Sequence, residues 1–199
     1  MSAVEVRPKS RELTADALPP GAQHLYQRLH CASLGRSNDE WLARMLVSQA
    51  WGMGIMPRRL GLSLGDFSTM MVRHFPGVSL APFLCGHELD RRRLPEFEDL
   101  RRLFLTHGEE RDETAWLATM LAAGCMGGDH LWQDMGLWSR RDLSALIASN
   151  FPALAARNEH DMKWKKFFYK QLCLQEGIYA CRAPSCQVCS DYAACFGPE

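Results

Sequence analysis

An internal repeat constrains the fold of this chain more than any other feature of its sequence. The block from Trp41 to Leu62 aligns with the block from Trp116 to Leu137 at a constant offset of 75 residues, and eight residue types coincide. After one inserted residue, Gly65 to Pro76 aligns with Arg141 to Pro152, so each copy ends in Phe-Pro. Two copies predict a pseudo-symmetric core rather than a solenoid, which would need three or more stacked units.

Each copy has the spacing of apolar residues that is typical of helices. Apolar residues recur every three or four positions, as they do on one face of an α-helix, and no convincing alternation of strand type is present. A Gly-rich turn joins two such stretches, and proline after the last phenylalanine stops further helix. The sequence therefore predicts an all-α fold with two pseudo-repeated helix-turn-helix units, at about residues 41–76 and 116–152. The apolar positions expected in the core of the first copy are Leu42, Met45, Leu46, Phe67, Met70, Met71 and Phe75.

Residues that commonly start helices precede several of these stretches. Asn38 and Asp39 come before Trp41, Ser139 comes before Asp142, and Asn158 comes before the segment that starts at Met162. Serine and asparagine favour this position because their side chains accept hydrogen bonds from the first backbone N–H groups of a helix.

Three regions follow along the chain. Residues 1–20 are charged and contain three prolines, which predicts a flexible leader. Residues 21–172 form the predicted helical domain. Residues 173–199 form a Cys-rich tail with too few apolar residues to build a core, and we expect this irregular segment to be a metal-binding loop.

Composition excludes some classes of function. The 23 basic residues balance 23 acidic ones, and no basic run with interleaved aromatic residues is present, so we expect no nucleic-acid partner. The longest uncharged apolar stretch, Leu117 to Gly128, has twelve residues, whereas a membrane-spanning helix needs about 20. The N-terminus has no apolar stretch of signal-peptide length, which predicts a cytoplasmic protein without a membrane span.

The two copies differ most in the turn. His130 to Asp134 occupies the place that Ile55 to Arg59 has in the first copy. If the shared residues are scaffold, these polar substitutions are candidates for function; ordinary surface variation is the alternative. The acidic run from Glu109 to Glu113 indicates solvated charge.

Five of the eight cysteines lie in the last 27 residues. In a reducing compartment, clustered thiols are more often metal ligands or redox groups than disulfides. The other three, Cys31, Cys85 and Cys125, are scattered singly, and we expect each to be a small buried hydrophobic residue.

The thiols of the tail have the spacing C-x4-C-x2-C-x5-C. They are Cys181, Cys186, Cys189 and Cys195. Soft thiolates select zinc or an iron–sulfur cluster over magnesium or calcium. The second distant Cys pair of most structural zinc sites is missing, and C-x4-C-x2-C also opens the plant-type ferredoxin pattern, so the spacing favours iron–sulfur. A zinc site and redox-active thiols remain alternatives.

A predicted amphipathic helix precedes the tail. Trp164, Phe168 and Leu172 form an apolar stripe that should dock it on the core. A second stripe consists of Lys163, Lys166 and Lys170, and a fifth thiol, Cys173, lies at its edge. The lysines form either a solvated face or a group of cations that draws an anionic metal species towards the thiols.

Three segments of the chain resemble the NifQ family of nitrogen-fixation proteins. They are HLWQDMGL from His130, NEHDMKWKKFFYKQLC from Asn158, and CRAPSCQVCSDYAACFGPE from Cys181. The resemblance implies an iron–sulfur protein that binds molybdenum and delivers it for biosynthesis of the iron–molybdenum cofactor of nitrogenase. It also implies the nitrogenase iron protein and the NifEN scaffold as recipients.

Such a role fits a carrier of metal better than a turnover enzyme. Molybdate is an oxyanion, whereas the cofactor needs molybdenum bound to sulfide, so a carrier must exchange oxygen ligands for sulfur. We expect a cluster of the 4Fe-4S or 3Fe-4S type, with the four tail thiols as principal ligands and Cys173 as a reserve or alternative ligand at the molybdenum corner. His130 is a further candidate, because imidazole can complete a molybdenum coordination sphere; a partly buried structural histidine is the alternative.

Overall fold

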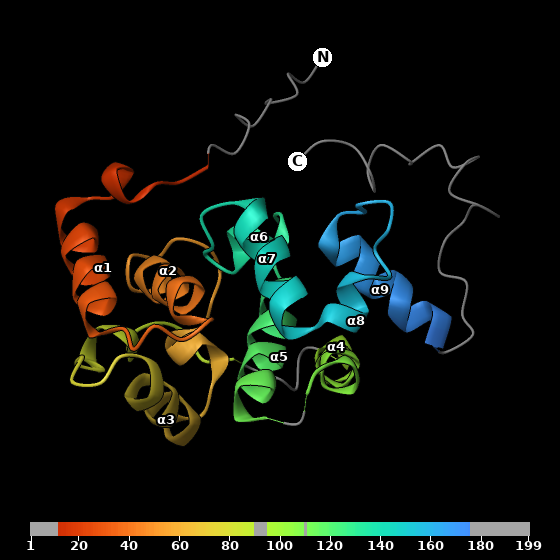
Figure 1. Ribbon diagram of the computed structural model, residues 1–199, viewed down its shortest axis with the longest axis horizontal. Helices are drawn as coiled ribbons and strands as arrows, with labels where there is room; N and C mark the ends of the chain where they lie inside the picture. Colours follow the sequence, from red (N-terminus) through yellow and green to blue (C-terminus); the bar gives the residue numbers. More distant parts are fainter. Residues whose placement is uncertain (1–11, 90–94, 110, 176–199) are drawn as a thin grey trace, which may run out of the picture.

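The computed structural model describes residues 12–89, 95–109 and 111–175, and none of these residues lies in a strand (Figure 1). The α-helices are α1 (Pro20–Ala32), α2 (Asp39–Ala50), α3 (Leu64–His74), α4 (Pro95–His107), α5 (Asp112–Cys125), α6 (Leu131–Asp134), α7 (Arg140–Asn150), α8 (Pro152–Ala155) and α9 (Trp164–Gln175). The short 3-10 helices are η1 (Ala15–Ala17), η2 (Arg58–Gly61) and η3 (Ala81–Phe83). The prediction of an all-α fold is confirmed for this part of the chain. In these ranges no helix is both long and apolar enough to cross a bilayer.

The repeat is longer in the structure than the sequence comparison indicated. Helices α1 and α4 both have 13 residues and both begin with proline, and their first and last residues are 75 positions apart. Each unit therefore contains four elements: α1, α2, η2 and α3 in the first, and α4, α5, α6 and α7 in the second. The extra helix escaped the sequence comparison because α1 and α4 share little beyond their first residue and one leucine of the core face, Leu25 and Leu100.

Equivalent helices begin with the same capping hydrogen bond and end with the same backbone geometry. Ser63 and Ser139 are the N-caps of α3 and α7, and each hydroxyl accepts a hydrogen bond from the backbone N–H of the aspartate three residues later, at 3.1 Å. Phe75 and Phe151 end these helices with φ −136° in both and ψ 61° and 55°. The predicted start at Ser139 is confirmed, and α2 begins at Asp39 as its start signal predicts.

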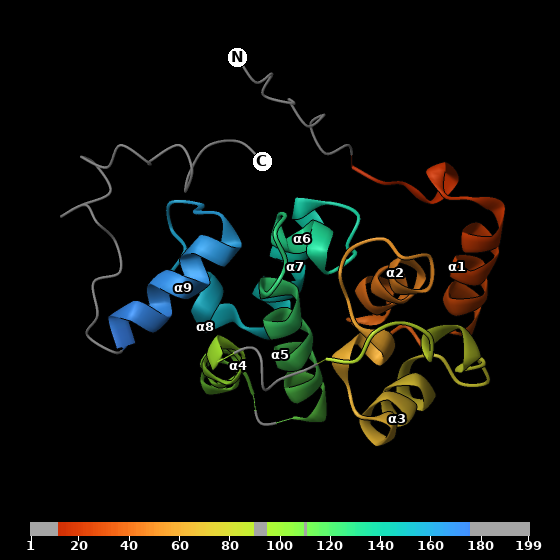
Figure 2. The ribbon, with the colours of Figure 1, turned by 180° about the vertical axis from the view of Figure 1, so that it is seen from behind.

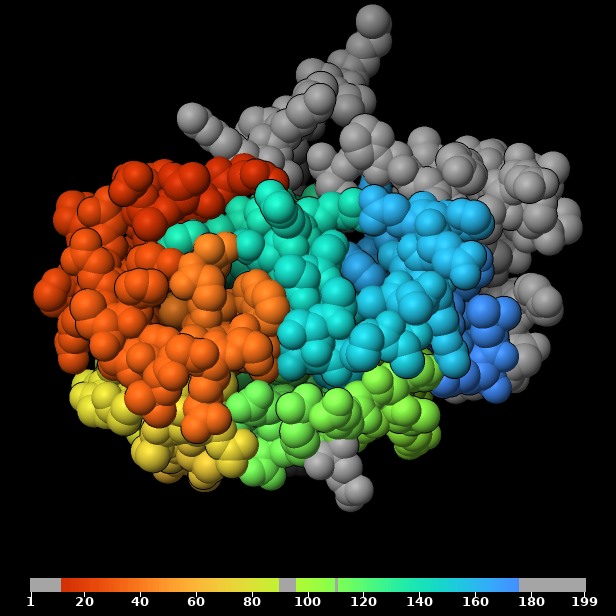
Figure 3. All heavy atoms as spheres, in the orientation of Figure 1, coloured from red at the N-terminus to blue at the C-terminus, as the bar shows by residue number. Residues whose placement is uncertain are grey.

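The two units lie at different ends of the molecule. Helices α1, α2 and α3 form one end, and α4, α8 and α9 form the other, with α5, α6 and α7 between them (Figures 1 and 2). The space-filling view shows the same order across one face, from red and yellow to green and blue (Figure 3). The apolar residues that the periodicity predicts for the core are all buried: Leu42, Met45, Leu46, Phe67, Met70, Met71 and Phe75.

The turns of the two units pack against each other. The backbone N–H of Ile55 donates to the carbonyl oxygen of Asp134 at 2.9 Å. Gly54 has φ +81°, and a Cβ at this position would lie 2.6 Å from the carbonyl oxygen of Gln133. Only glycine allows this close approach, so the turn glycines are structural here.

A buried polar network joins the helix starts of one unit to the helix ends of the other. His74 Nδ1 lies 2.6 Å from Asp39 Oδ1, and His74 Nε2 lies 3.3 Å from Glu113 Oε1. Asn38, at the position equivalent to Glu113, bonds to Asn150, at the position equivalent to His74. The two contacts are thus related by the pseudo-symmetry. The prediction of solvated charge is wrong at Glu113, whose side chain is 18% exposed because it faces this network.

The structure differs from the sequence predictions in the leader and at the start of α9. Within the predicted leader, Leu18 is buried and the backbone N–H of Leu13 donates to the carbonyl oxygen of Trp138, whereas residues 1–11 lie outside the described residues. Asn158 does not start α9: its side chain closes a turn by bonding to both backbone groups of Met162, and the helix begins at Trp164. The boundaries at residues 20 and 172 stay predictions.

Candidate metal centre

The last described helix carries one of the five predicted thiol ligands. Cys173 lies in the last turn of α9 and is partly exposed. The other four, Cys181, Cys186, Cys189 and Cys195, lie outside the described residues. Within residues 12–89, 95–109 and 111–175, no three His, Cys, Asp or Glu side chains are grouped to hold a metal ion. Cys173 is therefore the one predicted thiol ligand that lies in the described part of the chain.

The apolar face of α9 docks on the second unit, as its pattern predicts. Trp164, Phe167 and Phe168 are buried. The rings of Phe168 and Phe104 meet edge to face, with centroids 4.8 Å apart and an interplanar angle of 86°. The indole Nε1–H of Trp164 donates to Ser144 Oγ at 3.0 Å. Burial of three aromatic rings holds this helix firmly, because each contributes about 2–3 kcal/mol.

Two of the three predicted lysines lie on the side of α9 that carries Cys173. Lys163 immediately precedes α9, and Lys166 and Lys170 are exposed on it. Residues four and three positions apart share a face of a helix, so Lys166, Lys170 and Cys173 follow one another along one side of α9. This arrangement places two cations on the side of the helix that carries the thiol.

A fourth lysine, which the stripe pattern did not single out, makes the polar contact between α9 and the second unit. Lys165 Nζ donates to the carbonyl oxygen of Gly127 at 2.9 Å and forms an ion pair with the Asp134 carboxylate. The two side chains are 16% and 2% exposed. The carboxylate also accepts a hydrogen bond from the backbone N–H of Asp129 at 3.0 Å. Asp134 belongs to the turn in which the two copies of the repeat differ. The acidic residue here, where the first copy has Arg59, was the sequence signal that could have identified the contact.

Small and apolar residues surround this ion pair. A Cβ on Gly127 would overlap the Asp134 carboxylate, so glycine is needed for the approach. Burial raises the pKa of the Cys125 thiol to about 12; the charge of Lys165 opposes this effect, and that of Asp134 adds to it. Cys125 thus stays a neutral thiol at physiological pH, as expected for a buried hydrophobic residue.

The prediction of burial is wrong for Cys31 and Cys85, which are exposed. Cys31 lies off the core face of α1, which consists of Ala22, Leu25 and Leu29. Cys85 lies in the segment that follows η3.

His130 begins the turn that Lys165 contacts. It is the N-cap of α6 and is partly buried, and its backbone N–H donates to Gln133 Oε1 at 3.3 Å. Eight residues of helix separate Lys165 from Cys173, which is about 12 Å along the axis. The structure therefore places His130 near the start of α9 and Cys173 near its end.

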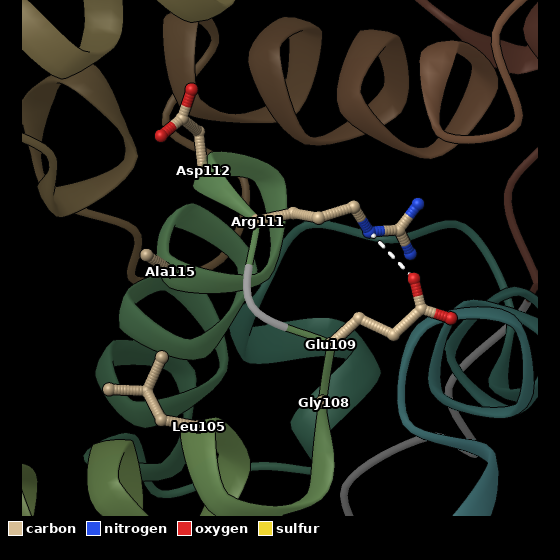
Figure 4. A pocket seen from close by; sticks show the side chains of 6 residues that line it. All are labelled: Leu105, Gly108, Glu109, Arg111, Asp112 and Ala115. Atoms are coloured by element: carbon tan, nitrogen blue, oxygen red, sulfur yellow. Dashed lines mark ion pairs between the residues drawn. The ribbon is translucent and has the colours of Figure 1, made fainter.

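An open hollow at the junction of α4 and α5 contains none of the predicted ligands. It is lined by Leu105, Gly108, Glu109, Arg111, Asp112 and Ala115 (Figure 4). Two of these residues, Arg111 and Glu109, form an ion pair, with Arg111 Nε 3.1 Å from Glu109 Oε2 (Figure 4). Because its charges are mutually compensated, this hollow has little attraction for a metal oxyanion.

Known proteins resemble most of the chain. The NifQ family model matches residues 41–197, which include the four tail thiols. Protein NifQ of Azotobacter vinelandii is 44% identical over 178 residues, covering 82% of this chain and 90% of that protein. Protein NifQ of Klebsiella pneumoniae is 41% identical over 170 residues, covering 79% and 97%. Protein NifQ of Rhodobacter capsulatus is 41% identical over 160 residues, covering 79% and 87%. No solved structure matches the chain significantly. The chain therefore belongs to the NifQ family, which is implicated in nitrogen fixation.

Proposed function

We propose that this chain is an iron–sulfur protein that binds molybdenum and delivers it for biosynthesis of the iron–molybdenum cofactor of nitrogenase. The observation that carries the proposal is the C-x4-C-x2-C-x5-C spacing shortly after α9, in a chain that belongs to the NifQ family. In this proposal Cys181, Cys186, Cys189 and Cys195 are the principal ligands of a 4Fe-4S or 3Fe-4S type cluster.

The position of Cys173 supports a role beside these four thiols. Its side chain is partly exposed at the end of a firmly docked helix, so its sulfur is accessible from outside the core. In the proposal it is the alternative ligand at the molybdenum corner. When bound, the cluster would supply sulfide in exchange for the oxygen ligands of molybdate, while the protein holds and orients it.

His130 is the second proposed ligand for molybdenum. Six positions separate Gln175, the last residue of α9, from Cys181, and an extended chain of that length spans up to about 22 Å. Chain length therefore allows the tail thiols to reach the His130 turn from the far end of α9. His130→Ala should lower the ratio of bound molybdenum to iron, and His160→Ala, which removes an exposed histidine, is the matched control. An unchanged ratio in His130→Ala removes this ligand.

The lysines of α9 are proposed to attract the anionic molybdenum species. Replacing Lys163, Lys166 and Lys170 together by glutamine should slow molybdenum uptake without loss of iron. Three exposed arginines on other helices, Arg28, Arg102 and Arg141, provide a control with the same change in net charge. Equal uptake in the two triple variants contradicts a local effect.

The recipients and the location belong to the proposal as well. The family resemblance makes the nitrogenase iron protein and the NifEN scaffold the partners, and a reducing cytoplasm would keep the tail thiols available for metal.

Anaerobic reconstitution with iron, sulfide and molybdate tests the proposed function. We expect a brown protein that contains both metals, with an electron paramagnetic resonance signal of an iron–sulfur centre. Serine at the four tail positions should abolish iron binding, whereas serine at the exposed Cys31 and Cys85 should leave it intact. A colourless protein with about one zinc and no iron would instead support a zinc-stabilised interaction module. Dependence on a single reactive thiol would support a redox role.

A further inference from the structure

We propose that Asp134 and Lys165 are positioning residues of the metal centre, because their ion pair fixes the start of α9 on the Gly127 turn and so fixes where Cys173 lies. This inference rests on the proposed function. It concerns residues that neither the thiol spacing nor the lysine stripe identified.

Stabilisation of the fold alone does not explain why Asp134 and Lys165 form a buried ion pair. Both side chains are largely buried, and removal of two charges from water offsets most of their attraction, so apolar residues of similar volume serve stability about as well. The first unit has Arg59 at the position of Asp134, and Arg59 pairs with Glu88 near the surface instead. Buried polar pairs are better suited to selecting one arrangement among several that pack equally well.

The hydrogen bond and the ion pair of Lys165 are directional, as selection of one position for α9 requires. Contacts between apolar rings such as Phe168 and Phe104 have little directionality, whereas Lys165 Nζ must meet both the Gly127 carbonyl oxygen and the Asp134 carboxylate. The N–H of Asp129 donates to the same oxygen of that carboxylate and helps to orient it. A shift of α9 by one residue moves each side chain about 1.5 Å along the axis and 100° around it, which would break all of these contacts.

Fixing the start of the helix also fixes its end. Cys173 follows Lys165 by eight residues of continuous helix. Because a helix is stiff over two turns, the position and direction of the Cys173 sulfur depend on the register that Lys165 selects. The same contact holds the turn that carries His130, so one ion pair relates the two candidate molybdenum ligands in the described part of the chain.

Two matched sets of variants test the inference. Asp134→Leu with Lys165→Met removes the pair while keeping side-chain volume, so this double variant should fold. Gly127→Ala displaces the carboxylate, whereas Gly128→Ala is its neighbour control, because a Cβ there meets nothing within 4 Å. Phe67→Leu controls for lost stability, because Phe67 is buried on α3, which lies at the opposite end of the molecule from α9 (Figures 1 and 2).

The first readout needs no metal. In the apo protein, the double variant and Gly127→Ala should show faster hydrogen exchange in α9. In the same two variants, alkylation of Cys173, mapped by mass spectrometry, should be several-fold faster than in wild type. In the controls Gly128→Ala and Phe67→Leu, both rates should equal those of wild type. Wild-type rates in the double variant would overturn the inference.

The second readout uses the reconstituted protein. Loss of supporting contacts around a metal site typically weakens binding about tenfold, so we expect a tenfold weaker hold on molybdenum at unchanged iron content. Molybdenum retention equal to wild type in the double variant overturns the positioning role. If wild-type protein binds neither metal, the proposed function fails, while the exchange and alkylation rates still decide whether the pair fixes α9.

Discussion

Asn38 and Asn150 exchange two side-chain hydrogen bonds across the interface between the two repeat units. Asn38 Nδ2 donates to Asn150 Oδ1 at 3.0 Å, and Asn150 Nδ2 donates to Asn38 Oδ1 at 2.8 Å. The two residues lie 112 positions apart in the sequence and are 1% and 6% exposed. This reciprocal pair joins the start of α2 to the end of α7, so the polar network specifies how the units meet.

Removal of one partner should therefore cost more than one ordinary hydrogen bond. In Asn150→Ala, the buried Oδ1 of Asn38 loses its donor, and an unsatisfied buried polar group costs about 1–3 kcal/mol. Urea unfolding measures the free energy of unfolding for this variant. Ser149→Ala, an exposed change on the same helix, should stay within about 0.5 kcal/mol of wild type. Equal stability of the two variants would show that the pair does not hold the units together.

The acid side of the stability curve should depend on Asp39. Burial acts to raise the pKa of its carboxyl group, but hydrogen bonds with Ser33, His74 and the backbone N–H of Arg36 outweigh it and hold that pKa below its ordinary value. A lowered folded pKa stabilises the protein above the unfolded value of about 3.9, and this contribution is lost as the pH falls through the folded pKa.

The free energy of unfolding should accordingly fall between about pH 5 and pH 3, and less steeply in Asp39→Asn than in wild type. Urea titrations at a series of pH values measure the slope, with Ser149→Ala as a variant that removes no ionisable group. A slope in Asp39→Asn as steep as that of wild type would assign acid sensitivity to other carboxyl groups.

The two equivalent N-caps should contribute similar stability. Ser63→Ala and Ser139→Ala each remove an acceptor for the third N–H of a helix, which costs about 1 kcal/mol. Glycine at either position should cost only a few tenths, because it leaves the N–H open to water. Ser68→Ala within α3 is the control, and thermal unfolding compares the variants. A loss of stability at only one of the two positions would show that the equivalent capping hydrogen bonds do not contribute equally to stability.

Periodicity and repeats predicted the parts of the fold that depend on local pattern. The spacing of Leu42, Met45 and Phe67 was sufficient to predict buried helix faces, and Ser139 to predict a helix start. Contacts such as Asn38 with Asn150 escaped prediction because a pattern along the chain does not say which polar side chains meet across an interface. Lys165 was missed for the same reason: only the docking of α9 distinguishes it from the lysines of the stripe.

The last helix also explains an asymmetry between the repeat units. Arg28 on α1 and Leu103 on α4 occupy equivalent positions, yet Arg28 is exposed and Leu103 is 1% exposed. Helices α8 and α9 pack on α4, whereas α1 packs on α2 and the short η1. At this pair of equivalent positions, an apolar residue is therefore required only in the second unit.

Truncation of these two residues should have opposite consequences. Leu103→Ala should cost about 2–5 kcal/mol because it leaves a cavity in the core of the second unit. Arg28→Ala should stay within about 0.5 kcal/mol, since it changes a solvated position. Urea unfolding gives both values, and hydrogen exchange should localise the loosening in Leu103→Ala to α4 and α9. Equal losses in the two variants would contradict the claim that α9 makes the units energetically different.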